Sequence, residues 1–555
     1  MQFFKKLIIY KPIQLLLIII IFVITRSANS TDLPDQLAPY YTIIPKPVSI
    51  IAADGAFMIN PATRIVGNHA ELRPLADFIA NFLATPLNAK IKIAPLSIIP
   101  QLNTISLILD QHANIAPEGY QLTITSDNII ITAQTATGAF WAFMTLCQLM
   151  PVQAHQKMAL VNSTIKVPCV IIKDAPRFAY RGLHLDSSRH FFPVEFIKKY
   201  LDLMAFYKLN FFHWHLTDDQ GWRIEIKKYP KLQAISAHRD QTLSGHLYSS
   251  PPTFDNKSYG GYYTQVEIKE IVAYAQQRHI TIIPEIELPG HSLAVLAAYP
   301  NLGCTGGPYQ TGTTWGIFDD VYCAGNDEVF IFLQNILTEI FELFPGKYIH
   351  IGGDEVRKNR WQQCPKCQVR MKNENLKTEA DLQDYFITRI EKFINSHHRQ
   401  IIGWDEIISD QLSPTATIMS WRGTQGGIQA ANSNYQVIMT PDEYLYFDYY
   451  QSKSPYEPLA IGGHTPIEKV YNYEPIPAEL TDSQAKYILG AQANVWTEYM
   501  ATPAHVEYMV FPRLGALAEL TWTPVAQKDY INFLSRLKHN INYLRAMSVY
   551  YAELH

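Results

Sequence analysis

Eight short apolar segments, each followed by a stretch whose apolar residues have helical spacing, recur through residues 174–529. They lie at residues 180–186, 209–218, 280–287, 348–355, 400–406, 417–422, 435–441 and 487–497. Short buried strands that alternate with helices are typical of parallel sheets with crossover helices. Eight such units predict an α/β fold of the (β/α)8 TIM barrel type, with insertions between some of the units.

The segments on either side of this barrel have different patterns. Residues 31–173 contain alternating apolar segments at 104–109 and 119–132, followed by helical spacing at 137–146. This pattern predicts a small α+β domain that precedes the barrel. The domain has no cluster of acids, histidines or glycines, so we expect it to be non-catalytic. Residues 530–555 are predicted to form a C-terminal helix that packs on the barrel.

The N-terminal segment has the order of a secretory signal. Lys5 and Lys6 precede an apolar run at residues 13–24, and small residues follow. This order predicts a signal peptide at residues 1–30, with cleavage before Thr31. We therefore expect an exported protein, periplasmic or secreted, with no stable membrane span after cleavage. The run is shorter than the about 20 residues that a spanning helix needs, and an uncleaved N-terminal anchor is the alternative.

Polar and aromatic residues gather at the predicted strand ends. Catalytic groups of a TIM barrel lie at the C-terminal ends of its strands and on the loops that follow. The sequence places acids, histidines, arginines, a tyrosine and tryptophans there: Arg181, Asp186, His213, His215, Asp218, Asp219, Glu285, Glu287, His291, Asp354, Glu355, Trp404, Asp405, Glu406, Trp421, Arg422, Tyr446, Asp448, Trp496 and Glu498. Each residue alone fits an ordinary core or turn position, but their agreement across eight strands predicts a catalytic cleft.

Asp354 and Glu355 are adjacent and follow two glycines at the fourth strand. Alone, this pattern also fits a surface turn. Carboxyl groups beside aromatic faces favour glycoside hydrolysis, which usually needs two carboxyls on opposite sides of the scissile bond, about 5–9.5 Å apart. Sequence neighbours cannot easily flank a bond in this way. The adjacency therefore predicts that the substrate itself supplies the nucleophile.

These motifs resemble those of the family 20 β-N-acetylhexosaminidases. The resemblance rests on RGLHLD at 181–186, HWHLTDDQGWR at 213–223, PGH at 289–291, HIGGDE at 350–355, GWDE at 403–406 and NVWTE at 494–498. It covers nearly all of the chain after the predicted signal peptide. It implies an exo-acting enzyme that hydrolyses terminal N-acetylglucosamine or N-acetylgalactosamine residues of glycans or chitooligosaccharides, with retention through an oxazolinium intermediate. It implies no cofactor and no metal.

The resemblance also implies roles for individual residues. Glu355 would be the general acid and then the general base, and Asp354 would orient and stabilise the attacking 2-acetamido group. Tyr446 would donate a hydrogen bond to the acetamido oxygen. His291 and Asp186 would form a relay behind Glu355 that tunes its acidity. The residues expected to bind the sugar are Arg181, Trp404, Trp421, Asp448, Trp496 and Glu498.

Other functions are less consistent with the sequence. The net charge is −4 and no long run of one sign occurs, which argues against nucleic-acid binding. His213 and His215 are spaced as in metal-dependent amidohydrolases, but these need further histidines where Trp404 and Trp421 stand. A sugar-binding barrel without catalysis is a second alternative. The intact pair of acids at 354–355 argues against it.

Six cysteines remain, at positions 147, 169, 304, 323, 364 and 367. An even number in an exported protein suggests disulfides, and Cys304 and Cys323 lie in one glycine-rich segment where a loop closes easily. Cys364 and Cys367 fit half of a zinc site or a redox pair. No second pair with matching spacing is evident, so a local disulfide or two free thiols, and no metal, are predicted.

Overall fold

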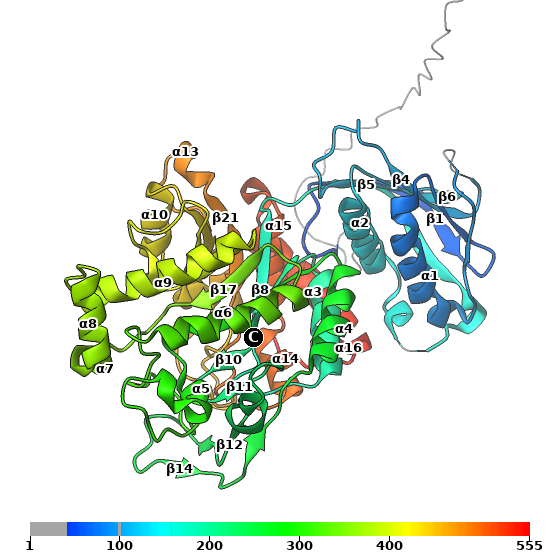
Figure 1. The fold of residues 1–555 in the computed structure, drawn as a ribbon. Coiled ribbons are helices and arrows are strands. Elements are labelled where there is room, and N and C mark those ends of the chain that lie inside the picture. The colour runs from blue at the N-terminus through cyan, green and yellow to red at the C-terminus, as the bar shows by residue number, and fades with distance from the viewer. Residues whose placement is uncertain (1–41, 98–100, 157, 555) are drawn as a thin grey trace, which may run out of the picture. The chain divides into compact units, whose positions relative to one another are not determined.

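The computed structural model describes residues 42–97, 101–156 and 158–554. The predicted signal peptide at residues 1–30 lies outside them. Among the described residues, no helix combines the length and the apolar character needed to cross a membrane. Figure 1 shows an N-terminal α+β domain that is followed by a barrel of strands with surrounding helices.

Eight parallel strands close into a barrel, which confirms the predicted fold class. In barrel order they are β8 (Tyr180–Asp186), β9 (Phe211–His215), β16 (Thr281–Leu288), β17 (Tyr348–Gly352), β18 (Gln400–Trp404), β19 (Thr417–Ser420), β20 (Gln436–Met439) and β21 (Ile488–Ala493). Each lies in one of the eight predicted segments, to within one residue. Several predicted segments run past the strand end, because the polar residues after it belong to the loop.

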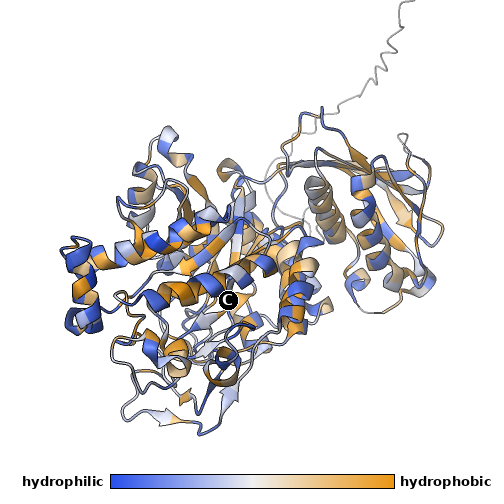
Figure 2. Cartoon of the chain, in the orientation of Figure 1, coloured by the Kyte–Doolittle hydropathy of each residue, from blue (hydrophilic) through white to orange (hydrophobic). Residues whose placement is uncertain are grey.

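Amphipathic helices cover the outside of the barrel. They include α3 (Val194–Phe206), α4 (Gln265–Gln276), α6 (Asp327–Leu343), α9 (Glu379–Ser396), α10 (Gln425–Asn432) and α15 (Arg513–Trp522). Figure 2 shows hydrophobic and hydrophilic residues mixed along them. Thr264 and Thr378 begin α4 and α9 with capping boxes, in which side chains satisfy backbone amides of the first turn.

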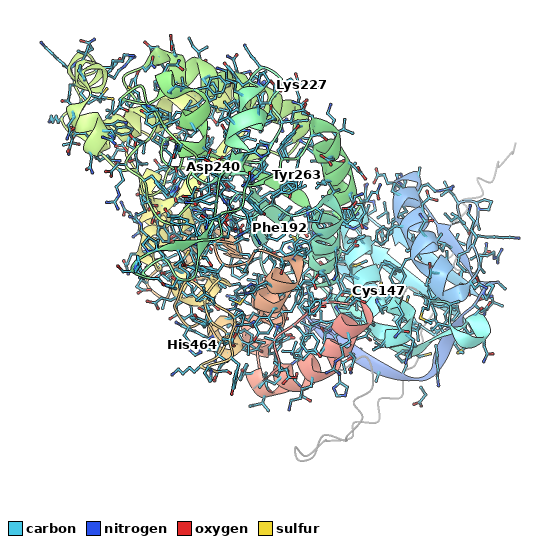
Figure 3. The ribbon with its side chains drawn as sticks, turned by 90° about the horizontal axis from the view of Figure 1, so that it is seen from below. Cys147, Phe192, Lys227, Asp240, Tyr263 and His464 are labelled. Atoms are coloured by element: carbon cyan, nitrogen blue, oxygen red, sulfur yellow. The ribbon has the colours of Figure 1, made fainter. Side chains whose placement is uncertain are left out.

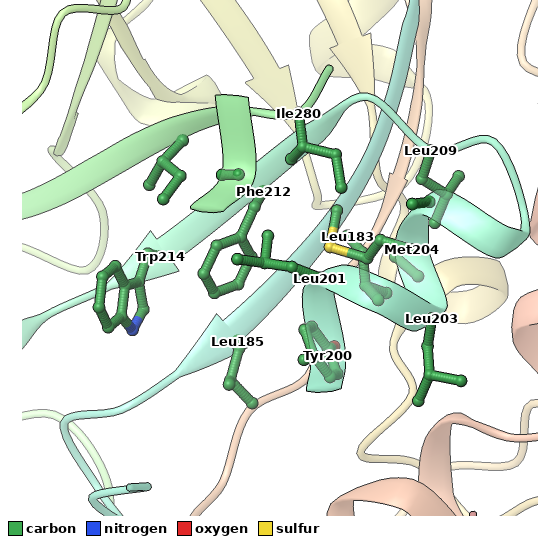
Figure 4. Close-up of a cluster of buried hydrophobic side chains, with 14 of the residues drawn as sticks. Leu183, Leu185, Tyr200, Leu201, Leu203, Met204, Leu209, Phe212, Trp214 and Ile280 are labelled. Atoms are coloured by element: carbon green, nitrogen blue, oxygen red, sulfur yellow. The ribbon is translucent and has the colours of Figure 1, made fainter. Parts of the chain in front are cut away.

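The first β/α unit shows how each helix is held. Leu185 of β8 and Phe212 and Trp214 of β9 stand at alternate strand positions, on the outer face of the barrel, and are fully buried. Phe212 lies against Tyr200 of α3, with ring centroids 5.8 Å apart, and Leu185 and Leu201 lie beside this pair (Figure 4). Burial of side chains of this size stabilises the fold by about 1.5–3 kcal/mol each. This packing leaves the strand ends free to carry polar groups.

In its described residues, the N-terminal domain is a mixed seven-stranded sheet with two α-helices, as predicted for an α+β domain. The sheet order is β1 (Ser49–Ile59), β7 (Ile165–Asp174), β5 (Tyr120–Ile124), β6 (Asn128–Ala133), β4 (Thr104–Leu109), β2 (Arg64–Gly67) and β3 (Lys92–Ile93). Its helices are α1 (Arg73–Leu87) and α2 (Ala136–Leu149). Helix α2 is buried on almost every side.

The last long helix, α16 (Tyr530–Ala546), contacts both parts of the chain. Arg536 of α16 forms a buried ion pair with Glu519 of α15. Tyr543 of α16 donates a hydrogen bond of 2.7 Å to the backbone oxygen of Gln148 in α2. The predicted C-terminal helix therefore packs on the barrel and also on the N-terminal domain.

Insertions after the strands build the walls above the barrel. The hairpin of β10 (Thr217–Asp218) and β11 (Gly221–Trp222) follows β9. Tyr263, in a later part of the same insertion, donates a hydrogen bond of 2.6 Å to the backbone oxygen of Phe192 in the β8–α3 loop (Figure 3). After β16 and β17 come α5 (Leu293–Ala298), α7 (Asn359–Gln363) and α8 (Pro365–Asn373).

The cysteine predictions are only partly correct: Cys364 and Cys367 are free thiols, which is one of the two predicted states. All six are free, so the expected disulfide between Cys304 and Cys323 is absent. The Cys323 sulfur lies 3.6 Å from that of Cys364 and 3.7 Å from that of Cys367, and the Cys304 sulfur lies 3.8 Å from that of Cys367. A disulfide needs about 2.05 Å. The second pair for Cys364 and Cys367 exists, but it comes from a loop about 40 to 60 residues earlier in the chain, a contact that sequence spacing cannot reveal.

Candidate active site

A strained turn after β17 presents the two adjacent acids. Gly352, Gly353 and Glu355 have φ values of 64°, 93° and 49°, all in the left-handed region. A Cβ atom on Gly352 would lie 1.9 Å from a carboxylate oxygen of Glu287, so only glycine fits there. Glu355 is not a glycine, and its backbone strain costs about 1–3 kcal/mol. Such strain typically persists at functional sites, and here it places the side chains of Asp354 and Glu355 at the barrel mouth.

His291 lies between these acids and a second acidic pair. Its Nε2 atom is 3.5 Å from a carboxylate oxygen of Asp354 and 3.5 Å from one of Glu355. Its Nδ1 atom is 3.0 Å from Asp219 and 3.2 Å from Asp218. Burial alone would lower the pKa of His291, but Asp218 and Asp354 outweigh it and raise that pKa well above its usual range. His291 is therefore an imidazolium that ties the two acidic pairs together.

The predicted relay between His291 and Asp186 is wrong. Asp186 ends β8, and its carboxylate accepts hydrogen bonds from the backbone amides of Ser188, Arg189 and Thr497. These bonds fix the loops after β8 and β21. Asp219 takes its place beside His291, because the β10–β11 hairpin follows β9, the strand that pairs with β16.

The predicted sugar-binding role of Arg181 is also wrong. Arg181 is fully buried near the start of β8, and its guanidinium lies 2.6 Å from a carboxylate oxygen of Glu118 in the N-terminal domain. Asp186 at the other end of β8 is five residues further on, about 16 Å along the strand. Arg181 therefore supports the bottom of the barrel and is remote from the strand ends.

Arg189, which was not among the predicted site residues, lies at the barrel mouth instead. Its guanidinium contacts Asp186 at 3.2 Å, Asp218 at 2.9 Å and Glu498 at 3.8 Å. It also lies over the ring of Trp496, 5.2 Å from the centroid. Its position three residues after the end of β8 could have identified it from the sequence, because the functional residues of a TIM barrel lie on the loops after the strand ends.

Aromatic rings line the mouth on the side of β18 to β21. Trp404, which ends β18, has its ring centroid 5.8 Å from that of Trp496. Trp421 stacks at 6.2 Å on Tyr446, whose ring is 6.5 Å from Trp496. The predicted aromatic residues therefore form one connected wall. The indole Nε1 of Trp404 has no hydrogen-bond partner among the described residues.

Two buried carboxyl groups complete this side. Burial, with Glu498 nearby, raises the pKa of Asp448 well above its usual range, and one Asp448 oxygen has no hydrogen-bond partner among the described residues. Burial also raises the pKa of Glu498, against the opposing charge of Arg189. A buried polar atom without a partner is costly unless a ligand satisfies it. Asp448 is thus suited to hydrogen bonding with a sugar hydroxyl.

Glu406, which follows β18, lies in a cavity wall beside Glu355. A cavity of about 430 Å³ opens beside Glu355 and is lined by Glu355, Val356, Lys358, Gln383, Glu406, Trp421 and Arg422. Burial and the charge of Asp354 raise the pKa of Glu406 to about 8. One of its oxygens accepts a hydrogen bond of 3.0 Å from the indole of Trp421. Glu406 is therefore a group in the cavity wall next to Glu355 that can take up a proton.

His215, in the His-x-His motif at the end of β9, lies in a network of acids. Both of its ring nitrogens face carboxylates, Nδ1 that of Glu285 and Nε2 that of Asp218 at 2.8 Å. Burial would lower the pKa of His215, but Glu285 and Asp218 raise it to about 10. His213 also lies 3.1 Å from the carboxylate of Glu285. The His-x-His motif therefore braces the floor of the cleft.

Comparison with known proteins agrees with this geometry. The sequence model of the glycosyl hydrolase family 20 catalytic domain matches residues 178–525, and that of domain 2 of the family matches residues 40–175. A β-hexosaminidase of Porphyromonas gingivalis is 45% identical over 528 residues, which make up 94% of this chain and 66% of that protein. A β-hexosaminidase of Vibrio furnissii is 35% identical over 494 residues, covering 88% of this chain and 77% of that protein.

Solved structures are similar over the same length. A GH20 exo β-N-acetylglucosaminidase from Vibrio harveyi, in complex with N-acetylglucosamine, has a TM-score of 0.81 and 33% identity, and the match covers 94% of this chain and 80% of that one. The N-acetyl-β-hexosaminidase of Streptomyces plicatus has a TM-score of 0.80 and 29% identity over 94% of this chain and 98% of that one. With both domains matched in order and the barrel carrying the acids at its mouth, this chain belongs to glycosyl hydrolase family 20.

Proposed function

We propose that the chain is an exo-acting β-N-acetylhexosaminidase that removes terminal, non-reducing N-acetylglucosamine or N-acetylgalactosamine residues with retention of configuration. The observation that carries the proposal is the shared contact of Asp354 and Glu355 with His291. Two acids held by one imidazolium act on the same side of a bound sugar. The names of the related proteins support the same activity.

The first half of the reaction breaks the glycosidic bond. The carbonyl oxygen of the substrate's 2-acetamido group attacks the anomeric carbon, and the bond to the leaving oxygen breaks as Glu355 donates its proton to that oxygen. Positive charge develops on the acetamido group as the oxazolinium ring forms. Asp354 lies beside Glu355 and stabilises that charge, while the Tyr446 hydroxyl donates a hydrogen bond to the acetamido oxygen.

The second half restores the enzyme. Glu355, now a carboxylate, takes a proton from water as the water oxygen attacks the anomeric carbon, and the ring opens to release the sugar with its original configuration. His291 holds both acids through its Nε2 atom during these steps, and Asp219 and Asp218 fix its orientation from behind. A positioned acid and base of this kind contributes about 10²–10⁴-fold to the rate.

The wall residues define the subsite for the sugar. Trp404, Trp421 and Trp496 enclose the acetamido methyl and the ring face, as aromatic rings do for apolar sugar faces. Arg189, Asp448 and Glu498 hold the ring hydroxyls. Because Asp448 is buried with an unpaired oxygen, a sugar that lacks the matching hydroxyl leaves that oxygen unsatisfied. The substrate class is therefore glycans or chitooligosaccharides with a terminal N-acetylhexosamine, met after export of the chain.

The test is turnover of chromogenic aryl β-N-acetylglucosaminides and β-N-acetylgalactosaminides by the full chain, with Glu355→Gln as the matched variant. We expect the wild type to hydrolyse these substrates and the variant to lose most of its turnover while remaining folded. NMR of the first product is expected to show the β anomer. No turnover by the wild type, or initial release of the α anomer, would contradict the proposal.

A further inference from the structure

Four cysteine sulfurs converge outside the barrel mouth, and the reaction above does not use them. Cys304 and Cys323 come from the loop that precedes α6, Cys364 caps the start of α8, and Cys367 lies in its first turn. Their sulfurs all lie within 4.8 Å of one another. Cys323, Cys364 and Cys367 are buried, and Cys304 is partly buried. Cys147 on α2 and Cys169 on β7 belong to the N-terminal domain and lie apart from this group (Figure 3 labels Cys147).

The sulfur separations are those of a metal tetrahedron. Zinc binds thiolates at about 2.3 Å with tetrahedral geometry, which sets the distance between neighbouring sulfurs at about 3.8 Å. Three of the separations are 3.6, 3.7 and 3.8 Å, and they connect all four sulfurs. Disulfides would draw the sulfurs together in two pairs at about 2.05 Å. The observed arrangement has no such pairing, since Cys323 is equally close to Cys364 and Cys367.

Neighbouring contacts hold the loop before α6 and the start of α8 close together. Gly325 passes so close to α8 that a Cβ atom there would lie 2.2 Å from the carbonyl carbon of Lys366. The indole of Trp361 donates a hydrogen bond of 2.9 Å to the backbone oxygen of Tyr322, next to Cys323. Arg360 and Asp320 add an ion pair of 2.7 Å between the same segments. The Gly325 amide donates a hydrogen bond to the Cys323 sulfur, the contact by which backbone amides commonly support a metal-bound thiolate.

We propose that Cys304, Cys323, Cys364 and Cys367 form a structural Zn²⁺ site. All four coordination positions are filled by protein sulfur, so the site is closed and has no room for substrate or water. On binding, the four thiols release four protons and the ion is held by four thiolates. The site joins the loop before α6 to the segment that begins nine residues after Glu355. Its role is to fix this loop and this segment relative to one another, independently of the sugar that the cleft binds.

The first experiment measures metal on the full chain, purified without chelator or reductant. We expect one zinc per chain by elemental analysis, and native mass spectrometry that shows the mass of the thiol form plus one zinc less two protons, because the divalent ion replaces two positive charges. X-ray absorption is expected to give four sulfur neighbours at about 2.3 Å. A metal-free chain with the mass of two disulfides, or with four free thiols, would overturn the proposal, as would a zinc ion with nitrogen or oxygen neighbours.

Variants assign the ion to these residues. Cys323→Ser and Cys367→Ser are expected to lose the stoichiometric zinc, while the matched controls Cys147→Ser and Cys169→Ser retain it. Retention by the first two variants would overturn the assignment. If the first two variants fail to fold, the wild-type coordination still decides, because the four sulfur neighbours can come only from this group among the described cysteines. The readouts do not depend on turnover, so failure of the hydrolase assignment leaves them unchanged.

Discussion

At the residue scale, the position of each charged side chain along its strand decides what it does. Arg181 and Arg189 lie eight residues apart and are both buried, yet one pairs with the N-terminal domain and the other with acids of the cleft. The sequence presents both as conspicuous cations beside the same strand. The direction of β8 distinguishes them: Arg181 lies near its start, below the barrel, and Arg189 follows its C-terminal end, at the cleft.

The two arginines can be separated experimentally. Arg189→Ala is expected to lower kcat/KM by about 10- to 100-fold, because charge-assisted hydrogen bonds of this kind contribute about 1.5–3 kcal/mol. Arg181→Ala is expected to leave kcat/KM of the folded enzyme nearly unchanged. It is expected to lower the free energy of unfolding by about 3 kcal/mol, because Glu118 is left without its charge partner. Steady-state kinetics and urea denaturation measure both. A larger kinetic effect for Arg181→Ala would reverse the two assignments.

Glu406 makes stability depend on pH in a defined window. Its pKa is about 8 in the folded chain and that of an unfolded glutamate is about 4.3, so between these values the folded state binds more protons. The free energy of unfolding therefore falls as pH rises through this window. Glu406→Gln is expected to make the decline shallower, measured by urea denaturation at about pH 5 and about pH 8. Parallel slopes for wild type and variant would show that Glu406 titrates normally.

At the element scale, the turns after the strands carry the chemistry, and the strands and helices hold those turns in place. The β17 turn is the clearest case, because three left-handed or strained residues aim two acids at one histidine from the β16 loop. The bounds of the barrel strands could be predicted from the sequence, because each apolar run ends where polar residues begin. Contacts between loops, such as His291 with Asp219, depend on which strands are neighbours in space, and the sequence carries no direct sign of them.

The turn itself can be tested with a pair of glycines. Gly352→Ala is expected to destabilise the fold by about 1–3 kcal/mol and to lower turnover, because the new methyl group meets Glu287 in addition to the strained φ of 64°. Gly423 has a φ of 73° and no atom within 4 Å of the place that a methyl group would take, so it is the control for backbone strain alone. Gly423→Ala is expected to cost less, about 1 kcal/mol. Equal losses would mean that the contact with Glu287 is unimportant.

At the scale of the whole molecule, buried polar contacts join the N-terminal domain to the barrel. Asp174 ends β7 and accepts hydrogen bonds from Lys208 at 2.9 Å, Trp522 at 2.9 Å and Tyr120 at 2.6 Å. Lys208 and Trp522 belong to the barrel, and Lys208 is fully buried. The α+β class of the first domain could be predicted from strand periodicity. Its connection to the barrel could not, because these contacts join residues that lie far apart in the chain.

Loss of Asp174 is expected to be felt by the whole chain. Asp174→Ala leaves the Lys208 ammonium buried without its charge partner, which costs about 3–5 kcal/mol. The exposed Asp110→Ala, in the same domain, is the control and is expected to stay within about 0.5 kcal/mol of wild type. Calorimetry is expected to show one transition for both variants, shifted to lower temperature only for Asp174→Ala. A separate early transition for the N-terminal domain would contradict the coupling.

In the proposed mechanism the substrate's own acetamido group is the nucleophile, guided by Asp354. The most direct measurement compares kcat/KM for an aryl β-N-acetylglucosaminide and for the aryl β-glucoside with the same leaving group, using wild type and Asp354→Asn. We expect the wild type to prefer the acetamido substrate by at least about 10²-fold, and Asp354→Asn to lose about 10²–10³-fold on that substrate alone. Equal hydrolysis of both substrates by the wild type would contradict catalysis by the acetamido group.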